Sequence, residues 1–191
     1  MNTFVFIRHG ETDLAGRFCG HSDPELNAAG ESQAKILAEQ VAALGIDRIY
    51  SSDLRRASQT AAQLARQIGI EIETRPDLRE INFGLWESLH WQDVQEQFPS
   101  EANRWMKDFP KICAPEGEAY ESFTARIDAA MVSLLRHSSA RITAVVTHRG
   151  VMCYVLTRFF ACSEEEARMQ TSSYCAVVIP TTHACNCVVL P

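Results

Sequence analysis

Long apolar runs and a basic leader are both lacking in this sequence. Its 191 residues contain no stretch of about 18 consecutive apolar residues, and the opening MNTFVFIRHG places no basic segment before an apolar one. Positive charge is scarce as well, because 18 Lys and Arg face 24 Asp and Glu, for a formal net charge of -6. Binding to a nucleic-acid backbone requires a basic stripe that such a chain does not offer. We therefore expect a cytoplasmic protein with neither a membrane nor a nucleic-acid partner.

The cysteines lack the paired spacing of a disulfide framework. There are seven, an odd number, at positions 19, 113, 153, 162, 175, 185 and 187, so we expect reduced thiols. Near the C-terminus, His183, Cys185 and Cys187 could hold a soft metal ion. Alternating positions in an apolar strand explain the same spacing, and the sequence offers no second pair of ligands. We expect neither a metal nor a cofactor.

Internal repeats, low-complexity tracts and long linkers are absent too. The chain is 46% apolar and long enough to bury a core, so we expect one domain over residues 1–191. From about 76 to 116 the regular apolar spacing breaks down around Trp86, Trp91 and Trp105. We expect this irregular or helical segment to form an excursion over the functional site.

What the sequence does contain is an alternation of short apolar runs and helical spacing. Strands are expected at 3–7, 48–51, 70–74, 142–147, 175–179 and 187–190. Apolar residues three or four apart predict helices at 27–44, from a cap at Ser52 or Asp53 to Gly69, around 123–134, and at 151–160. This alternation predicts an α/β fold, a three-layer α/β/α sandwich with a mainly parallel central sheet.

Three of the expected strands end in polar residues. The first runs into Arg8-His9-Gly10-Glu11-Thr12, the second into Ser52-Asp53-Leu54-Arg55-Arg56, and the fourth into His148-Arg149-Gly150. In open sheets of parallel strands the site lies at the carboxyl edge, just past the strand ends. We therefore expect all three segments to converge on one pocket.

The residue types of these segments suit phosphate chemistry. A neutral imidazole is a nucleophile, and the helix expected after His148 would turn its N-terminal dipole toward an anion. Arg8 and one of Arg55 or Arg56 could grip the oxygens of a phosphoryl group. The sequence has no Walker-type glycine-rich loop and no acidic cluster suited to magnesium, so side-chain cations would have to stabilise the charge.

Four blocks in order resemble the histidine phosphatase superfamily, also called phosphoglycerate-mutase-like. They are RHGET at 8–12, SSDLRRASQT at 51–60, LREINFGLWE at 78–87 and VTHRG at 146–150. The resemblance covers nearly the whole chain. A lone RHG would be a weak signal, whereas four ordered blocks are a specific one.

The resemblance implies a role for each matching residue. His9 would take the phosphoryl group as phosphohistidine. The residues that would surround that group are Arg8, Arg56 and His148. In the family's pattern the arginine directly before the alanine of this helix lies in the pocket, which selects Arg56 over Arg55. Glu80 matches the acid that protonates the leaving oxygen, and the same carboxylate could then activate the hydrolytic water.

Five further residues are expected to contact the substrate: Cys19, Gly20, Ser22, Trp86 and Arg149. Two positions depart from the family's pattern. Ala15 stands where many relatives carry an asparagine that donates to the phosphate, and backbone amides near Gly20 or Ser22 could replace that donor. Cys19 stands where many relatives have Ser, Thr or Gln, and a thiol is a poorer donor than any of these.

The expected function is that of a metal-independent phosphomonoesterase acting on a small phosphorylated metabolite. The Pro115-to-Glu118 element and the 105–109 segment are similar to α-ribazole phosphatases of cobalamin assembly, which makes α-ribazole 5′-phosphate one candidate substrate. A promiscuous or sugar-phosphate phosphatase, a phosphoglycerate mutase and a non-catalytic phospho-ligand binder are the alternatives. The sequence leaves open whether the protein forms a homodimer.

Overall fold

A five-stranded sheet forms the centre of the protein. The computed structural model describes residues 3–109, 112–137 and 140–180. In these residues the strand order is β3-β2-β4-β1-β5. The strands are β1 (Thr3–Arg8), β2 (Arg48–Ser51), β3 (Ile72–Thr74), β4 (Ile142–Thr147) and β5 (Val177–Val178). The first four are parallel to one another, and β5 runs antiparallel to β1, so the predicted, mainly parallel sheet is confirmed.

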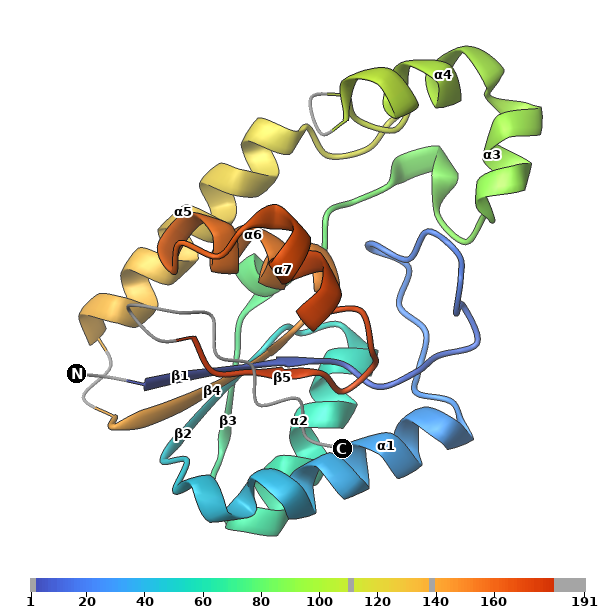
Figure 1. The fold of residues 1–191 in the computed structure, drawn as a ribbon. Coiled ribbons are helices and arrows are strands. Elements are labelled where there is room, and N and C mark those ends of the chain that lie inside the picture. Colours follow the sequence, from blue (N-terminus) through green and yellow to red (C-terminus); the bar gives the residue numbers. More distant parts are fainter. Residues whose placement is uncertain (1–2, 110–111, 138–139, 181–191) are drawn as a thin grey trace.

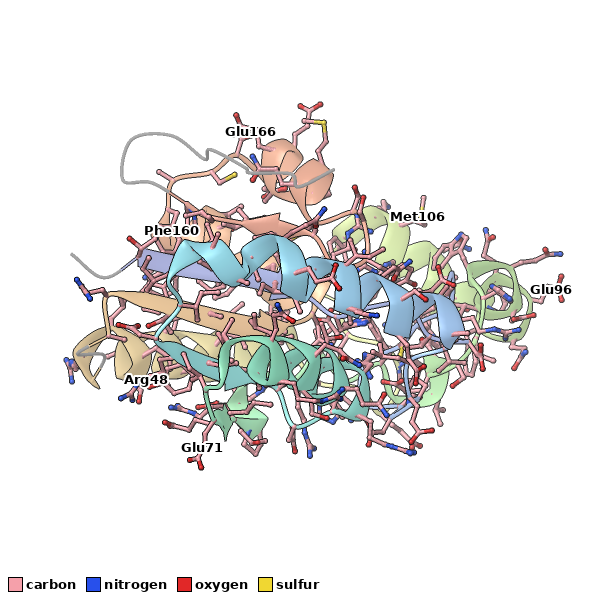
Figure 2. The ribbon with its side chains drawn as sticks, turned by 90° about the horizontal axis from the view of Figure 1, so that it is seen from below. Arg48, Glu71, Glu96, Met106, Phe160 and Glu166 are labelled. Carbon is pink, nitrogen blue, oxygen red and sulfur yellow. The ribbon has the colours of Figure 1, made fainter. Side chains whose placement is uncertain are left out.

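Helices cover both faces of the sheet (Figure 1). The seven α-helices of the described residues are α1 (Ala28–Val41), α2 (Arg55–Ile68), α3 (Trp91–Gln97), α4 (Pro99–Asp108), α5 (Tyr120–His137), α6 (Arg149–Phe159) and α7 (Glu164–Gln170). Helices α1 and α2 lie side by side on one face, as Figure 2 shows from below, and α5, α6 and α7 lie on the other. This is the predicted three-layer sandwich.

The alternation of side chains along β1 explains the two-sided core. Phe4 and Phe6 pack into the apolar cluster of α5 and α6, whereas Val5 and Ile7 pack into the cluster of α1 and α2. Successive residues of a strand point to opposite faces, and a strand buried on both faces reads as a continuous apolar run. The run at the start of the chain is therefore the sequence signal of a strand between two layers of helices.

The segment that contains α3 and α4 lies beyond the carboxyl ends of the strands (Figure 1, green). In Figure 2, Glu96 and Met106 mark this end of the molecule, far from Arg48 and Glu71. The segment has a core of its own in which Trp86, Val94, Ala102 and Ala114 are buried. Aromatic side chains pack around this core, among them Phe18, Phe83, Trp91 and Trp105.

Some element boundaries differ from the prediction. Strand β3 begins at Ile72 rather than at residue 70, and β5 covers only Val177–Val178 of the expected 175–179. Helix α7 was not predicted, although Ser163 and Glu166 form a capping box at its start. The expected strand at 187–190 and the cluster of His183, Cys185 and Cys187 lie outside the described residues.

The predicted cap of α2 is wrong. The helix begins at Arg55, and the Asp23 carboxylate accepts a hydrogen bond from the Arg55 amide at 2.6 Å. Asp53 instead pairs with Arg79. The cap comes from a distant segment, which local sequence rules cannot anticipate.

Within the described residues, none of the helices combines the length and apolar character needed to cross a bilayer.

Candidate active site

The polar ends of three strands meet at one edge of the sheet. In the register of the sheet, Arg8 of β1 lies beside Thr147 of β4, and Ser51 of β2 lies beside Val146 of β4. His9, Ser52 and His148 therefore follow at the same level, past the carboxyl ends. The convergence expected from the sequence is present.

His9 is held as a neutral base with a defined tautomer. Its Nδ1 lies 2.7 Å from the carbonyl oxygen of Gly10, so Nδ1 carries the proton and donates it. Nε2 is left with its lone pair and accepts from Nε of Arg56 at 3.3 Å. Burial lowers the pKa of His9 well below 6.5, and the positive charge of Arg56 lowers it further.

His148 lies beside His9, with the two ring centroids 5.2 Å apart. It is fully buried. Burial lowers its pKa well below 6.5, and the positive charge of Arg56 is the second cause. Its Nε2 lies 2.9 Å from the hydroxyl of Ser52. Its Nδ1 is buried without a hydrogen-bond partner in the described part of the chain.

Arg56 is fully buried and ties the 19–22 loop to His9. Its Nη atoms donate to the carbonyl oxygens of Cys19 at 3.2 Å, Gly20 at 2.8 Å and Ser22 at 2.7 Å. The neighbouring Arg55 is exposed and pairs with Glu25. The structure thus places Arg56, not Arg55, at the site.

Arg8 approaches from the end of β1. Its Nη1 donates to the carbonyl oxygens of Thr171, at 3.2 Å, and Ser172. Its Nε is buried without a hydrogen-bond partner among the described residues. Three buried side-chain nitrogens share this condition there, namely Nε of Arg8, Nδ1 of His148 and Nε1 of Trp86. Two of the three belong to this site, and an unpaired buried polar nitrogen is costly unless a ligand satisfies it.

Glu80 brings a buried carboxyl group to the same place. It is 7% exposed, and its oxygens accept from the amides of Gly150 at 2.8 Å and Ile81 at 3.0 Å. Burial raises its pKa above 4.5, against the opposing effect of those amides. A methyl group on Gly150 would run into the carboxylate, so a larger residue at this position would displace Glu80 from its present place.

Distant elements fix the backbone around Glu80. The carbonyl of Glu80 lies 3.1 Å from Nε2 of His21, and the hydroxyl of Thr147 donates to the carbonyl of Leu78 at 2.8 Å. Arg126 of α5 pairs with Glu118 and donates to the carbonyls of Asp77, Arg79 and Glu80. An acid in an irregular segment is thereby held rigidly.

A cavity of about 380 Å³ opens in front of these groups. Its wall consists of Arg8, His9, Thr12, Leu14, Gly16, Arg17, Phe18, Cys19, Glu80, Phe83, Trp91, Arg149 and Tyr174. Arg8, His9 and Glu80 thus face the same space, while Arg56 and His148 are buried beside His9. The sequence had suggested neither Tyr174 nor the aromatic side made by Phe18, Phe83 and Trp91. No local pattern distinguishes those residues from ordinary core aromatics.

The predicted substrate contacts divide into two groups. Cys19 and Arg149 line the cavity. Burial raises the pKa of the Cys19 thiol to about 11, so it stays protonated. Trp86, 0% exposed, lies inside the aromatic core of the α3–α4 segment, and this corrects its assignment to the pocket.

The amides of Gly20 and Ser22 are not free donors. This corrects the expectation that they donate to the phosphate in place of an asparagine. Both donate to Oε2 of Glu87 at 3.0 Å. They therefore cannot replace the asparagine donor that is missing at position 15, where this chain has Ala15. Their carbonyls instead orient Arg56.

In the described part of the chain, no three His, Cys, Asp or Glu side chains gather into a set that could hold a metal ion.

Comparison with known proteins agrees with this geometry. The family model of the histidine phosphatase superfamily (branch 1) matches residues 4–190. The chain belongs to this superfamily. The resemblance inferred from the four sequence blocks is thereby confirmed.

The relatives differ in the substrates that they are named for. An adenosylcobalamin/alpha-ribazole phosphatase of Salmonella typhimurium is 30% identical over 154 residues, 80% of this chain and 76% of the relative. Phosphoserine phosphatase 1 of Hydrogenobacter thermophilus is 29% identical over 162 residues, 82% of this chain and 77% of the relative. The alpha-ribazole phosphatase from Shigella flexneri has the same fold, with a TM-score of 0.84 at 24% identity over 93% of this chain and 89% of that one.

Proposed function

We propose that the protein is a metal-independent phosphomonoesterase that transfers the phosphoryl group of a small ester first to Nε2 of His9 and then to water. One observation carries this proposal. Nε2 of His9 accepts from Nε of Arg56 at 3.3 Å, the ring of His148 lies beside that of His9, and two nitrogens of the neighbouring residues, Arg8 Nε and His148 Nδ1, lack partners in the described residues. A phosphoryl group on Nε2 would meet the first donor and satisfy the other two.

In the first half-reaction Nε2 of His9 attacks phosphorus, and the bond to the ester oxygen breaks. Glu80, whose pKa is raised by burial, gives its proton to the departing oxygen. Arg8 and Arg56 hold the charge on the phosphoryl oxygens. The products of this step are an alcohol and phosphohistidine.

In the second half-reaction Glu80 acts as the base. Its carboxylate takes a proton from water, the water oxygen attacks phosphorus, and the bond to Nε2 breaks. Inorganic phosphate leaves, and both His9 and Glu80 return to their starting protonation states. One carboxyl group thus serves both steps.

The substrate that we propose is a small ester with a flat ring on its alcohol side. Phe18, Phe83 and Trp91 line one part of the cavity, and the cations of Arg17 and Arg149 line others. A volume of about 380 Å³ is at the small end of ligand sites. α-Ribazole 5′-phosphate, a ribose monophosphate with an aromatic base, fits this chemistry, and relatives named for it support the choice. We propose that it is met in the cytoplasm.

A phosphate-release screen in the presence of EDTA tests the activity. The panel contains α-ribazole 5′-phosphate, ribose 5-phosphate, phosphoserine, phosphoglycerates and p-nitrophenyl phosphate. We expect turnover that vanadate inhibits and a base-stable, acid-labile phosphoenzyme that is absent from His9→Ala. Vanadate binding without release of phosphate from any ester would favour a non-catalytic phospho-ligand binder.

A matched pair of tryptophan variants tests the aromatic side. Trp91→Leu should lower kcat/KM for α-ribazole 5′-phosphate by about 2- to 12-fold, the value of one aromatic contact, and should leave ribose 5-phosphate nearly unaffected. Trp105→Leu removes an indole of the same cluster that does not line the cavity. Equal losses on both substrates in Trp91→Leu would contradict the assignment.

A mutase is the second candidate, because a probable phosphoglycerate mutase GpmB of Enterobacter sp. is 30% identical over 172 residues, 87% of this chain and 80% of the relative. Isomerisation of 3-phosphoglycerate with a bisphosphate primer, without net release of phosphate, would decide for it.

A further inference from the structure

The segment between α7 and β5 closes over Arg8. The amide of Arg8 donates to the carbonyl of Ala176 at 3.0 Å, and the amide of Cys175 donates to the carbonyl of His9 at 3.3 Å. These two bonds hold Tyr174 at the carboxyl end of β1. Cys175 has a φ of 54°, in the left-handed region that residues other than glycine rarely adopt. Such outliers persist only where the surrounding contacts impose them, and they cluster at functional sites.

The ring of Tyr174 covers one face of the Arg8 guanidinium. Cζ of Arg8 lies 4.3 Å from the ring centroid, well inside the range of a cation–π contact. The same ring lies 5.9 Å, centroid to centroid, from the imidazole of His9. It also lines the cavity. Tyr174 therefore contacts the phosphate-binding cation and the reaction space together.

A second set of contacts holds the end of the same guanidinium. Nη1 of Arg8 donates to the carbonyls of Thr171 and Ser172. Thr171 is fully buried, and its hydroxyl donates to the carbonyl of Ala167 at 2.7 Å, so this acceptor is rigid. Nη1 and one face of the guanidinium are thus engaged, whereas the buried Nε has no hydrogen-bond partner among the described residues.

We propose that Tyr174 is a positioning residue whose ring fixes the Arg8 guanidinium in the orientation that turns Nε toward a phosphoryl oxygen. An arginine loses rotamer entropy when it binds an anion, and a ring that already restricts it lowers that loss. The ring face, not the hydroxyl, supplies this restriction. The inference rests on the proposed function in one respect, which is that Arg8 binds the phosphoryl group.

Three variants separate the ring from the general loss of a tyrosine. Dissociation constants for vanadate and inorganic phosphate are measured by calorimetry for Tyr174→Phe, Tyr174→Leu and Tyr120→Leu. Tyr120 packs against the core of α5 and α6, away from the cavity wall, and controls for lost packing. We expect Phe to bind within about 2-fold of the parent and Leu to bind about 2- to 30-fold more weakly, the range of one cation–π contact.

A spectroscopic readout addresses Arg8 itself. Its Nε–H resonance should be shifted by the ring current in the parent and in Tyr174→Phe, and should lose that shift in Tyr174→Leu but keep it in Tyr120→Leu. A purely structural role for Tyr174 would not produce this pattern. An unchanged Arg8 resonance in Tyr174→Leu would overturn the proposal.

A double-mutant cycle with Arg8→Met shows whether Tyr174 acts through Arg8. If it does, Tyr174→Leu costs no further phosphate affinity once Arg8 is replaced. Fully additive losses, or a Tyr174→Phe variant as weak as Tyr174→Leu, would overturn the proposal. A parent protein that binds vanadate but hydrolyses no ester would refute the proposed function, and the cycle would still decide the role of Tyr174.

Discussion

Burial shifts the pKa values of His9 and Glu80, the nucleophile and the acid of the proposed mechanism, in opposite directions. It lowers the pKa of His9 below 6.5 and raises the pKa of Glu80 above 4.5, because a site with little water disfavours the charged form of each group. His9 is therefore neutral, and Glu80 tends to keep its proton. These are the states that the first half-reaction requires.

The Glu80→Gln variant tests the role of this acid. We expect kcat/KM to fall by about 10²- to 10⁴-fold for an alkyl phosphate, because the leaving alkoxide needs a proton. The loss should be much smaller for p-nitrophenyl phosphate, whose leaving group is stable as an anion. In the parent, activity on alkyl esters should fall as the pH rises through the raised pKa of Glu80, and this alkaline limb should vanish in the variant.

Glu71→Gln, at an exposed carboxylate on the far side of the molecule (Figure 2), is the matched control and should leave both substrates unaffected. An equal loss on good and poor leaving groups would mean that Glu80 only shapes the site.

At the scale of elements, one carboxylate organises the loop that carries Arg56's partners. Glu87 accepts from the amides of Gly20, His21, Ser22 and Phe83 at 2.7 to 3.0 Å. Burial alone would raise its pKa, but hydrogen bonds from the Ser22 side chain and from these amides outweigh it and hold the pKa below 4.5. The loop and the segment that contains Glu80 are thus joined through one side chain.

We expect Glu87→Ala to lower the free energy of unfolding by about 2 kcal/mol, since charge-assisted hydrogen bonds are lost. Because the folded-state pKa is lowered, this stabilisation is present above pH 4.5 and is lost as the pH falls through the folded value. Urea unfolding at pH 7 and pH 4 should therefore show a large difference from the parent at pH 7 and a smaller one at pH 4. Glu96→Ala, at an exposed position of α3, is the control. A difference that does not depend on pH would contradict the assignment.

The sequence predicted those elements whose signal is local. Strands β2 and β4 match their apolar runs, and α2 ends at Gly69, which adopts a φ of 71° as a left-handed cap should. The cap supplied by Asp23 could not be predicted, because it depends on two segments 32 residues apart meeting in space. Helix α7 was missed although its capping box is a local signal.

The same distinction holds at the candidate site. His9 and His148 follow strands, and the resemblance aligned Arg56 and Glu80, so the sequence pointed to all of them. The contacts around them depend on tertiary structure. Ser52 and Glu87 lie within the matching blocks, but the blocks do not say that they bond His148 and the amide of Gly20, and Tyr174 lies in none of the four blocks. Trp86 was misassigned because an aromatic residue in an irregular segment packs a core as readily as it lines a pocket.

At the scale of the whole molecule, the site reduces stability in mild acid. His9 and His148 are both buried with pKa values below 6.5. Below pH 6.5 the unfolded chain binds protons on these histidines that the folded chain refuses, so stability falls as the pH falls. Glu80 has the opposite effect above pH 4.5, because its raised pKa makes the folded chain hold a proton that the unfolded chain has released.

A comparison of the parent with His148→Asn isolates one of these contributions. Each histidine that stays neutral in the fold contributes a slope of about 1.4 kcal/mol per pH unit below its unfolded pKa. The free energy of unfolding, measured in urea between pH 5 and pH 7.5, should therefore decline less steeply in the variant, by up to about that amount per unit. The two curves should run parallel above pH 7, where neither state is protonated at this position. Curves parallel over the whole range would mean that His148 takes up its proton in the folded protein, and the neutral pair of imidazoles on which the proposed phosphoryl pocket depends would not exist.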